Sequence, residues 1–329
     1  MPPTIERGST YADIVGNDPT PWTDDIEAKE TKWEKTYERE FFPISIKDFV
    51  KETGITECKG LLLPEGTASF ARYAAKCIAQ QAEIPEKIFY IMDCFRNEDV
   101  TKLTSEKRRA FGQIGVEYLS GKQESDAEVA AIACKIVNEL GVDKKFITAR
   151  VSNVEIFRGL CKETGMDNDE KVRMKTLIDR FSKLRLQDPY DSELQGIREM
   201  VWKISGRYRA NWNKLLEKDT KASDFAGMQL EQMIENIERT GFKAVFDASM
   251  IRGWEYYTGP IFQIDAGDFL EIAGGGRYDR MVNQFLKKYG IERELPATGF
   301  AFGTERLVNV VKRYATIPNE YTVAFRRKK

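Results

Sequence analysis

Two segments joined by a long basic loop constrain the fold of this chain most strongly. Residues 87–96 (KIFYIMDCFR) form a predicted strand, and residues 111–120 (FGQIGVEYLS) alternate as a half-buried strand does. The polar, charged stretch 97–109 connects them, which predicts a hairpin. Because hairpins are combined here with helices before, between and after them, an antiparallel α+β sheet is favoured over a doubly wound parallel one.

Other segments supply the helices and shorter strands of this sheet. A short strand is expected at 42–46, and a strand, a turn and a helix are expected from Gly60 to 80. The helix predicted at 126–140 ends at Gly141, a residue common at helix C-termini. Further helices are predicted at 26–41 and in the second half of 298–314, with strand, loop and strand between 242 and 282.

The chain is predicted to have five parts. They are an extended N-terminal arm (1–23), a first core segment (24–154), a helical insertion (155–240), a second core segment (241–315) and a C-terminal tail (316–329). The insertion is assigned because its residues are charged and helix-like, without a strand pattern.

The 329 residues include no histidine, which removes whole classes of enzyme. Ser-His-Asp and Cys-His nucleophiles, H-E-x-x-H metallopeptidases and histidine general bases are all excluded. The five cysteines are widely spaced, odd in number and free of a C-x-x-C pair, so reduced, buried thiols are expected. Carboxylates, arginines and backbone groups must therefore carry any chemistry.

Charge and hydropathy predict a cytosolic protein. There are 51 Lys and Arg against 52 Asp and Glu, which argues against binding nucleic acid through overall charge. The basic clusters 102–109 and 326–329 are most simply a solvated loop and a solvated tail. No stretch approaches the ~20 apolar residues of a membrane-spanning helix, and residues 1–25 lack a signal-peptide layout.

Four parts of the sequence place fixed charges or glycines where a predicted strand ends. They are Pro64-Glu65-Gly66-Thr67, the stretch from Phe95 to Glu117, the pair 252–259 and 274–279, and residues 299–306. In the second, Arg109, Phe111, Gln113, Gly115 and Glu117 share one strand face, which suits a ligand better than a core. Each part alone also fits an ordinary structure: a helix entrance, a solvated face, a bulge or a strand-to-helix turn.

The order of these parts resembles the catalytic domain of class II aminoacyl-tRNA synthetases, and within them the histidyl-tRNA synthetase family. The motifs are PEGT, an FR-x-E loop ending in R-x-F-x-Q-x-G-x-E, RG-x-x-YYTG followed by GGGRYD, and GFA-x-G-x-ER. They cover Gly60 to Val142 and Phe242 to Val311. The resemblance implies a class II synthetase-like antiparallel sheet flanked by helices, with a helical insertion.

The resemblance implies an adenylation reaction that uses ATP and Mg²⁺. The implied ATP contacts are Arg96, Glu98, Arg109, Phe111 and Arg306. Arg96 would meet the α-phosphate, Glu98 the adenine and Arg306 the γ-phosphate side. Arg252 would support attack of the amino-acid carboxylate on the α-phosphate, so Arg96, Arg252 and Arg306 are the implied catalytic residues. No protein ligand for the metal is identified.

The same resemblance implies an amino-acid site with histidine as the preferred ligand. Its residues are Glu65, Thr67, Gln113, Glu117, Tyr257 and Tyr278. The first three match positions that hold the α-ammonium, while Glu117 and Tyr257 match those that read the imidazole, with Tyr278 beside them. A carboxylate opposite a phenol can pair with both ring nitrogens of histidine.

The chain departs from the family pattern at several positions. Leu63 replaces the usual arginine before PEGT, and Gly112 replaces an aromatic residue or histidine, which is expected to enlarge the pocket. Between residues 42 and 60 the chain is shorter than in the family, and Lys47 stands where motif 1 has a proline. Both departures affect the expected edge of the implied homodimer. No anticodon-binding domain is expected, because the sequence stops soon after residue 314.

Three functions fit these features. The first is activation of histidine by ATP and its transfer to tRNA. The second is a synthetase paralogue that delivers the activated amino acid to another amine. The third is a non-catalytic, histidine-sensing regulatory subunit of ATP phosphoribosyltransferase. The arginines of the implied ATP site favour the first two, whereas the expected lack of an anticodon-binding domain favours the second and third.

Overall fold

The chain divides into two compact units, each built from separate stretches of sequence. The first unit comprises Met1–Ser120 and Asp279–Asn309, and the second comprises Gly121–Tyr278 and Val310–Lys329. The computed structural model describes residues 5–7, 43–44, 60–84, 86–96, 108–119, 122, 124–155, 221–247, 250 and 256–316. No helix in these ranges is long and apolar enough to cross a membrane.

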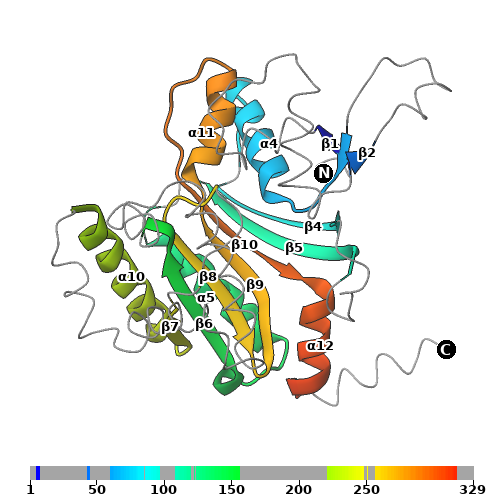
Figure 1. Ribbon diagram of the computed structural model, residues 1–329, viewed down its shortest axis with the longest axis vertical. Coiled ribbons are helices and arrows are strands. Elements are labelled where there is room, and N and C mark those ends of the chain that lie inside the picture. Colours follow the sequence, from blue (N-terminus) through cyan, green and yellow to red (C-terminus); the bar gives the residue numbers. More distant parts are fainter. Residues whose placement is uncertain are drawn as a thin grey trace, which may run out of the picture. The chain divides into compact units, whose positions relative to one another are not determined.

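The first unit contains three antiparallel strands in the order β4-β5-β10 (Figure 1). They are β4 (Lys87–Phe95), β5 (Ala110–Leu119) and β10 (Ala297–Gly303). β4 and β5 confirm the predicted hairpin, with Tyr90 paired opposite Gly115. On the other side of β5, Glu117 is paired opposite Gly299 of β10.

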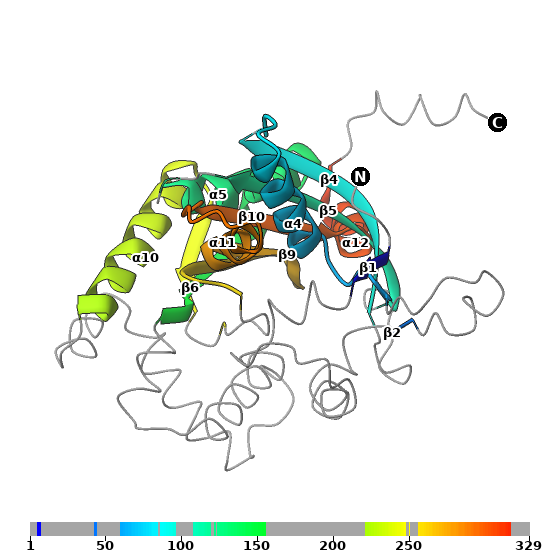
Figure 2. The ribbon, with the colours of Figure 1, turned by 90° about the horizontal axis from the view of Figure 1, so that it is seen from above.

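Two helices of the first unit, α4 (Thr67–Ala79) and α11 (Asp279–Lys288), lie side by side in both views (Figures 1 and 2). The small buried residues Ala68, Ala71, Ala74 and Ala75 of α4 allow other elements to approach its axis closely. Before α4, β3 (Gly60–Leu62) pairs antiparallel with β1 (Ile5–Arg7) and β2 (Pro43–Ile44). β2, β3 and α4 confirm three predicted elements.

The second unit contains four strands in the order β9-β8-β6-β7. They are β6 (Ile147–Asn153), β7 (Lys243–Phe246), β8 (Pro260–Ala266) and β9 (Phe269–Arg277). The β6–β7 pair is parallel, and the β6–β8 and β8–β9 pairs are antiparallel. The helices α5 (Ser125–Glu139) and α10 (Lys221–Arg239) pack against each other and against these strands (Figure 1).

The two faces of this second set of strands differ in polarity. Val151 and Phe262 are paired and fully buried on one face, as are Ala149 and Ile264. The neighbouring positions on the other face carry Arg150, Gln263 and Asp265. The second unit therefore has a buried polar sheet face that its sequence alone did not reveal.

Most of the predicted elements that can be compared with the structure are confirmed. α5, α10, the strands β7 to β10 and the helix α12 (Thr304–Tyr314) lie where strands or helices were expected. The short helix η2 (Lys144–Phe146), β1, β6 and α11 were not predicted. The expected helix at 26–41, most of the insertion (156–220) and the tail beyond 316 lie outside the described residues.

The cysteines that can be compared with expectation are free thiols. Cys94 and Cys134 are buried and Cys77 is half-buried. Burial raises the pKa of the Cys94 and Cys134 thiols to about 12, so both stay protonated at neutral pH.

Candidate functional site

The candidate site of the first unit begins at the turn Pro64–Thr67, where α4 starts. The carboxylate of Glu65, which is 4% exposed, accepts hydrogen bonds from the backbone N–H groups of Thr67 (2.6 Å) and Ala68 (3.0 Å). These N–H groups belong to the first helical turn and have no partner within the helix. Glu65, which precedes the N-cap residue Gly66, thus satisfies two N–H groups of the first helical turn and is a fixed, buried carboxylate.

The ionisation of Glu65 reflects opposing effects. Burial raises the pKa of the carboxyl above its usual value, while the N–H groups of Ala68 and Thr67 and the charge of Arg96 act in the opposite direction. Burial is the larger effect. Glu65 therefore takes up a proton at a higher pH than an exposed glutamate does.

Gln113 fastens this turn to β5. Its side-chain oxygen Oε1 accepts hydrogen bonds from the backbone N–H of Gly66 (2.9 Å) and from the thiol of Cys94 (3.3 Å). A backbone N–H can only donate, which fixes the orientation of the Gln113 amide. The amide nitrogen is therefore the end that suits a ligand, and it requires an acceptor such as a carboxylate oxygen. This differs from the α-ammonium contact that the resemblance implies.

Glu117 joins the turn to both strands of the hairpin. Its Oε1 accepts hydrogen bonds from the hydroxyls of Thr67 (2.9 Å) and Tyr90 (3.3 Å), and the residue is 1% exposed. A Cβ atom at Gly299 would overlap Oε2 of Glu117. The glycine on β10 therefore provides the space that the buried carboxylate occupies.

Tyr90 is a site residue that sequence reasoning missed. Its ring lies where a Cβ atom of Gly115 would be, and a Cβ atom at Gly66 would come within 2.5 Å of the same ring. Burial, with the negative charges of Glu117 and Glu65, raises the pKa of Tyr90 well above its usual value. The phenol remains neutral and able to donate. A glycine in the middle of a strand, opposite a bulky residue, was the available signal.

All five residues assigned to ATP by resemblance belong to the first unit, and the structure describes four of them. The Arg96 guanidinium donates to the carbonyl of Pro64 (3.2 Å) and lies 4.9 Å from the ring centroid of Phe111. The backbone N–H of Arg96 donates to the carbonyl of Arg109 (2.8 Å). Arg306 lies in the first turn of α12, directly after β10. The structure thus brings Arg96, Phe111 and Arg109 together at one end of the hairpin.

In the second unit, the predicted tyrosines are part of an aromatic cluster. Tyr257 is 5% exposed and Tyr278 is 1% exposed. The ring of Tyr256 lies 4.6 Å from that of Tyr257 and 6.4 Å from that of Tyr278, centroid to centroid. A Cβ atom at Gly276 would lie 2.9 Å from Tyr257 Cδ1 and 2.8 Å from both Ile261 Cγ2 and the Pro260 carbonyl oxygen, so this glycine makes room for the tyrosine and for β8.

Three residues of the sequence-based assignment lie outside the described residues. They are Glu98, Arg252 and Lys47.

The two departures near the site have structural rather than pocket roles. Leu63 is fully buried, and its carbonyl accepts a hydrogen bond from the N–H of Phe95 (2.7 Å). Gly112 lies on the strand face opposite to Gln113, and a Cβ atom there would lie 2.5 Å from Thr304 Oγ1. Gly112 therefore makes room for Thr304, and the expectation that it enlarges the pocket is wrong.

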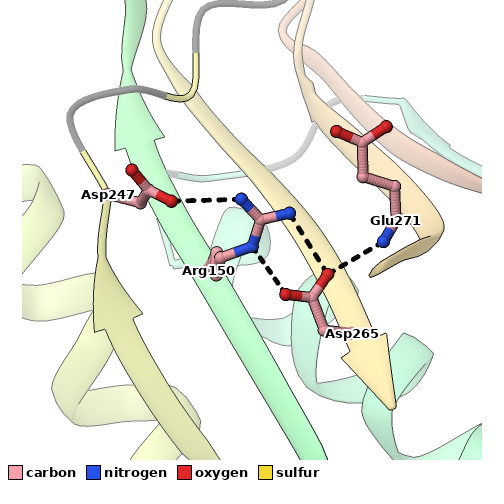
Figure 3. Close-up of polar contacts among 4 residues, drawn as sticks. All are labelled: Arg150, Asp247, Asp265 and Glu271. Carbon is pink, nitrogen blue, oxygen red and sulfur yellow. Dashed lines mark hydrogen bonds and ion pairs between the residues drawn. The ribbon is translucent and has the colours of Figure 1, made fainter. Parts of the chain in front are cut away.

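A second buried polar cluster lies on the polar sheet face of the second unit (Figure 3). The Arg150 guanidinium donates to Asp265 through Nε (2.6 Å) and Nη2 (3.2 Å), and to Asp247 through Nη1 (3.0 Å). Asp265 also accepts from the backbone N–H of Glu271 (2.8 Å). The motifs did not include any of these residues, because their contacts join positions up to 115 residues apart.

The described residues do not form a metal centre of their own. No group of three or more His, Cys, Asp or Glu side chains among them could hold a metal ion.

Comparisons with known proteins show which family this chain resembles. The family model described as histidyl-tRNA synthetase matches residues 62–307. The histidine–tRNA ligase of Methanococcus aeolicus is 26% identical over 260 residues, covering 75% of this chain and 59% of the relative. The ATP phosphoribosyltransferase regulatory subunit of Acetivibrio thermocellus is 30% identical over 266 residues, covering 77% of this chain and 60% of the relative. The chain thus spans less than two thirds of either relative.

Solved structures share the fold. The histidine–tRNA ligase subunit of Alicyclobacillus acidocaldarius matches with a TM-score of 0.68 and 20% identity, covering 94% of this chain and 86% of that one. A Bacillus halodurans protein described as an ATP phosphoribosyltransferase regulatory subunit/histidyl-tRNA synthetase matches with a TM-score of 0.65. These matches confirm the class II synthetase-like α+β fold. Because the family model spans well over half of the sequence, this chain belongs to the histidyl-tRNA synthetase family.

Proposed function

We propose that the protein uses ATP to activate an amino acid, preferably histidine, as an aminoacyl-adenylate and transfers it to tRNA. The observation that carries the proposal is the hydrogen-bonded network of the first unit, which links Glu65, Thr67, Glu117, Tyr90 and Gln113. Two buried carboxylates, two hydroxyls and an amide, which come from the turn at the start of α4 and from the paired strands β4 and β5, suit a small zwitterion better than they suit an apolar core.

The network supports separate recognition of the two ends of an amino acid. Glu65 and Thr67 are assigned to the α-ammonium, since both offer oxygen acceptors near a fixed negative charge. Gln113 is assigned to the α-carboxylate, because its Oε1 already accepts two hydrogen bonds. Glu117 of the first unit is assigned to the imidazole, and the family resemblance also assigns Tyr257 and Tyr278 of the second unit to the amino acid.

The adenylation step that we propose needs no histidine on the protein. An oxygen of the amino-acid carboxylate, already deprotonated, attacks the α-phosphorus, and the bond to the pyrophosphate oxygen breaks. Arg96, with Arg252, would stabilise the charge that develops at the α-phosphate, as guanidinium groups do in phosphoryl transfer. Glu98, Arg109, Phe111 and Arg306 would hold the rest of ATP.

Mg²⁺ fits this proposal as a companion of the ATP phosphates. Mg²⁺ is usually bound by substrate phosphates and water with only one or two carboxylates, so it does not require a protein cage. We also propose a homodimer, as the family resemblance implies, which analytical ultracentrifugation would test.

The second candidate function is that of a non-catalytic, histidine-binding regulatory subunit of ATP phosphoribosyltransferase. Relatives with that name are 29% and 30% identical to this chain, as close as the named ligases. This function would use the amino-acid site and a partner enzyme but not the ATP-site arginines.

Amino-acid-dependent exchange between ATP and pyrophosphate separates the candidates. We expect exchange with histidine above that with other amino acids, and a strong loss in Arg96→Gln. Absence of exchange with every amino acid, together with calorimetric histidine binding, would overturn the catalytic proposal and support the regulatory one. Exchange without charging of tRNA would point to another amine acceptor. Arg313→Gln, which removes an exposed charge in the second unit, is the matched control.

A further inference from the structure

Arg277 is a buried residue at the end of β9, directly before Tyr278. It is 7% exposed, and its Nε donates to Asp126 Oδ2 at 2.9 Å. Its Nη2 donates to the backbone carbonyl of Lys122 at 3.0 Å. Asp126, which is 2% exposed, lies in the first turn of α5. The guanidinium thus fastens the end of β9 to the start of α5.

The backbone of Arg277 fastens the loop that carries Tyr257. Its carbonyl accepts hydrogen bonds from the N–H of Thr258 (2.8 Å) and, more weakly, from the hydroxyl of Thr258 (3.4 Å). Thr258 follows Tyr257 directly, and the Tyr257 ring lies over Gly276, the residue before Arg277. The position of Tyr257 therefore depends on where the end of β9 is held.

Both tyrosines assigned to the amino acid are adjacent to this one anchor. Tyr278 follows Arg277 in the chain, and Tyr256 contacts the rings of both Tyr257 and Tyr278. A shift of Arg277 would move the two tyrosines together. A displacement of about 1 Å in a group that positions a ligand is enough to change how that ligand is recognised and how fast it reacts.

We propose that Arg277 is a positioning residue for amino-acid recognition. Through its ion pair with Asp126 and its bond to the Lys122 carbonyl, it fixes Tyr257 and Tyr278 in the orientation that contacts the amino-acid side chain. The inference rests on the proposed function, because that function assigns these tyrosines to the amino acid. It predicts an effect on the amino acid that is separate from any effect on ATP.

Arginine suits this role better than lysine does. A guanidinium offers several N–H donors in a fixed plane and here reaches two different acceptors. A lysine could keep the charge pair with Asp126 but is a single point charge on a flexible stem. The variants Arg277→Lys and Arg277→Met should therefore give graded effects.

The test measures KM for histidine, KM for ATP and kcat in the exchange reaction, together with the midpoint of urea unfolding. We expect KM for histidine to rise about threefold in Arg277→Lys and about tenfold or more in Arg277→Met, where tenfold corresponds to about 1.4 kcal/mol. KM for ATP should change by less than about twofold, because a residue that positions only the two tyrosines should leave ATP binding unaffected. Asp126→Asn keeps the side-chain shape and should raise KM for histidine about as much as Arg277→Lys does. It replaces Arg277→Met in the test if that variant does not fold.

The outcomes distinguish this inference from the function beneath it. If the unaltered protein neither exchanges nor binds histidine in calorimetry, the proposed function and this inference both fail. If it binds histidine and the folded Arg277→Lys and Asp126→Asn variants bind it equally well, only the positioning role is overturned. Equal rises in KM for histidine and ATP would also overturn it, because they indicate general loosening. Arg313→Lys, which alters an exposed ion pair with Asp268 in the same unit, is the matched control.

Discussion

Two buried acidic clusters among the described residues are held by different kinds of donor. In the first unit, Glu65 accepts from backbone N–H groups and Glu117 accepts from hydroxyls. In the second unit, Asp247 and Asp265 accept from the guanidinium of Arg150 (Figure 3). Neutral donors orient a carboxylate without cancelling its charge, whereas a guanidinium both orients and neutralises. The first arrangement suits a cationic ligand and the second suits a structural role.

Ionisation follows the same division. Burial raises the pKa of Glu65, so its negative charge is held against an unfavourable environment. Burial also opposes the charge of Arg150, but Asp265 and Asp247 outweigh it and raise the pKa of this guanidinium. A group whose charge costs free energy in the folded state is a candidate for binding, while a matched pair is a candidate for stability.

Arg150→Met should produce the largest effect, and on stability alone. Removing the guanidinium leaves Asp247 and Asp265 buried without their shared cation, which typically costs about 3–5 kcal/mol. Urea unfolding measures the loss. The combined variant Arg150→Met, Asp247→Asn, Asp265→Asn should recover much of it, because the buried charges are removed together. An Arg150→Met protein as stable as the original would show that the cluster does not carry the stability assigned to it.

Glu117→Gln should produce the next largest effect, and on binding rather than stability. The amide oxygen can still accept from Thr67 and Tyr90, so the shape of the network is kept while its charge is lost. Hydrogen bonds to charged groups contribute about 1.5–3 kcal/mol, so histidine affinity should fall roughly 10- to 150-fold.

Calorimetry of histidine binding measures this loss, and Asp265→Asn supplies the opposite control. That variant should lose stability and keep its histidine affinity. If Glu117→Gln loses stability and keeps its histidine affinity, while Asp265→Asn loses histidine affinity and keeps its stability, the distinction between the clusters is wrong.

Two glycines of β5 sharpen the comparison between the faces of one strand. Gly115→Ala places a Cβ atom in the Tyr90 ring, and Gly112→Ala places one 2.5 Å from Thr304 Oγ1. Overpacking of this kind typically costs about 1–3 kcal/mol, so both variants should lose stability. Only Gly115→Ala should also weaken histidine binding, because only its face carries Glu117 and Gln113. Equal affinity in the two variants would contradict the assignment of Tyr90 to the site.

Local patterns predicted much of this arrangement. The alternation of residues 111–120 placed Gln113 and Glu117 on one face, and the hairpin followed from two apolar segments and the loop between them. The same period of two puts Gly112 on the other face, so the expected enlargement of the pocket went against the pattern itself.

Contacts between distant segments were not predictable in the same way. The Arg150 cluster joins positions in β6 and β8 with Asp247, which directly follows β7. Their meeting depends on strand order, which no local period encodes. The sequence does not separate α11 from β9, because the amphipathic residues of the helix follow the glycine-rich strand with only Tyr278 between them. Tyr90 was missed because its role depends on what opposes it across the hairpin.

The pH dependence of binding should give the smallest but most specific difference between the clusters. Because burial raises the pKa of Glu65 above its usual 4.5, its folded form gains a proton at a higher pH than the unfolded chain does. Its contribution to stability therefore falls as the pH rises from 4.5 through the raised pKa. Binding of an ammonium requires the deprotonated form, so histidine affinity should rise over that same interval. Calorimetry at a series of pH values, on the original protein and on Glu65→Gln, measures both the trend in stability and the trend in histidine affinity. A wild-type affinity that stays level while the pH crosses this interval would show that the Glu65 charge does not serve the ligand, and Glu65 would then be, like Asp265, a purely structural carboxylate.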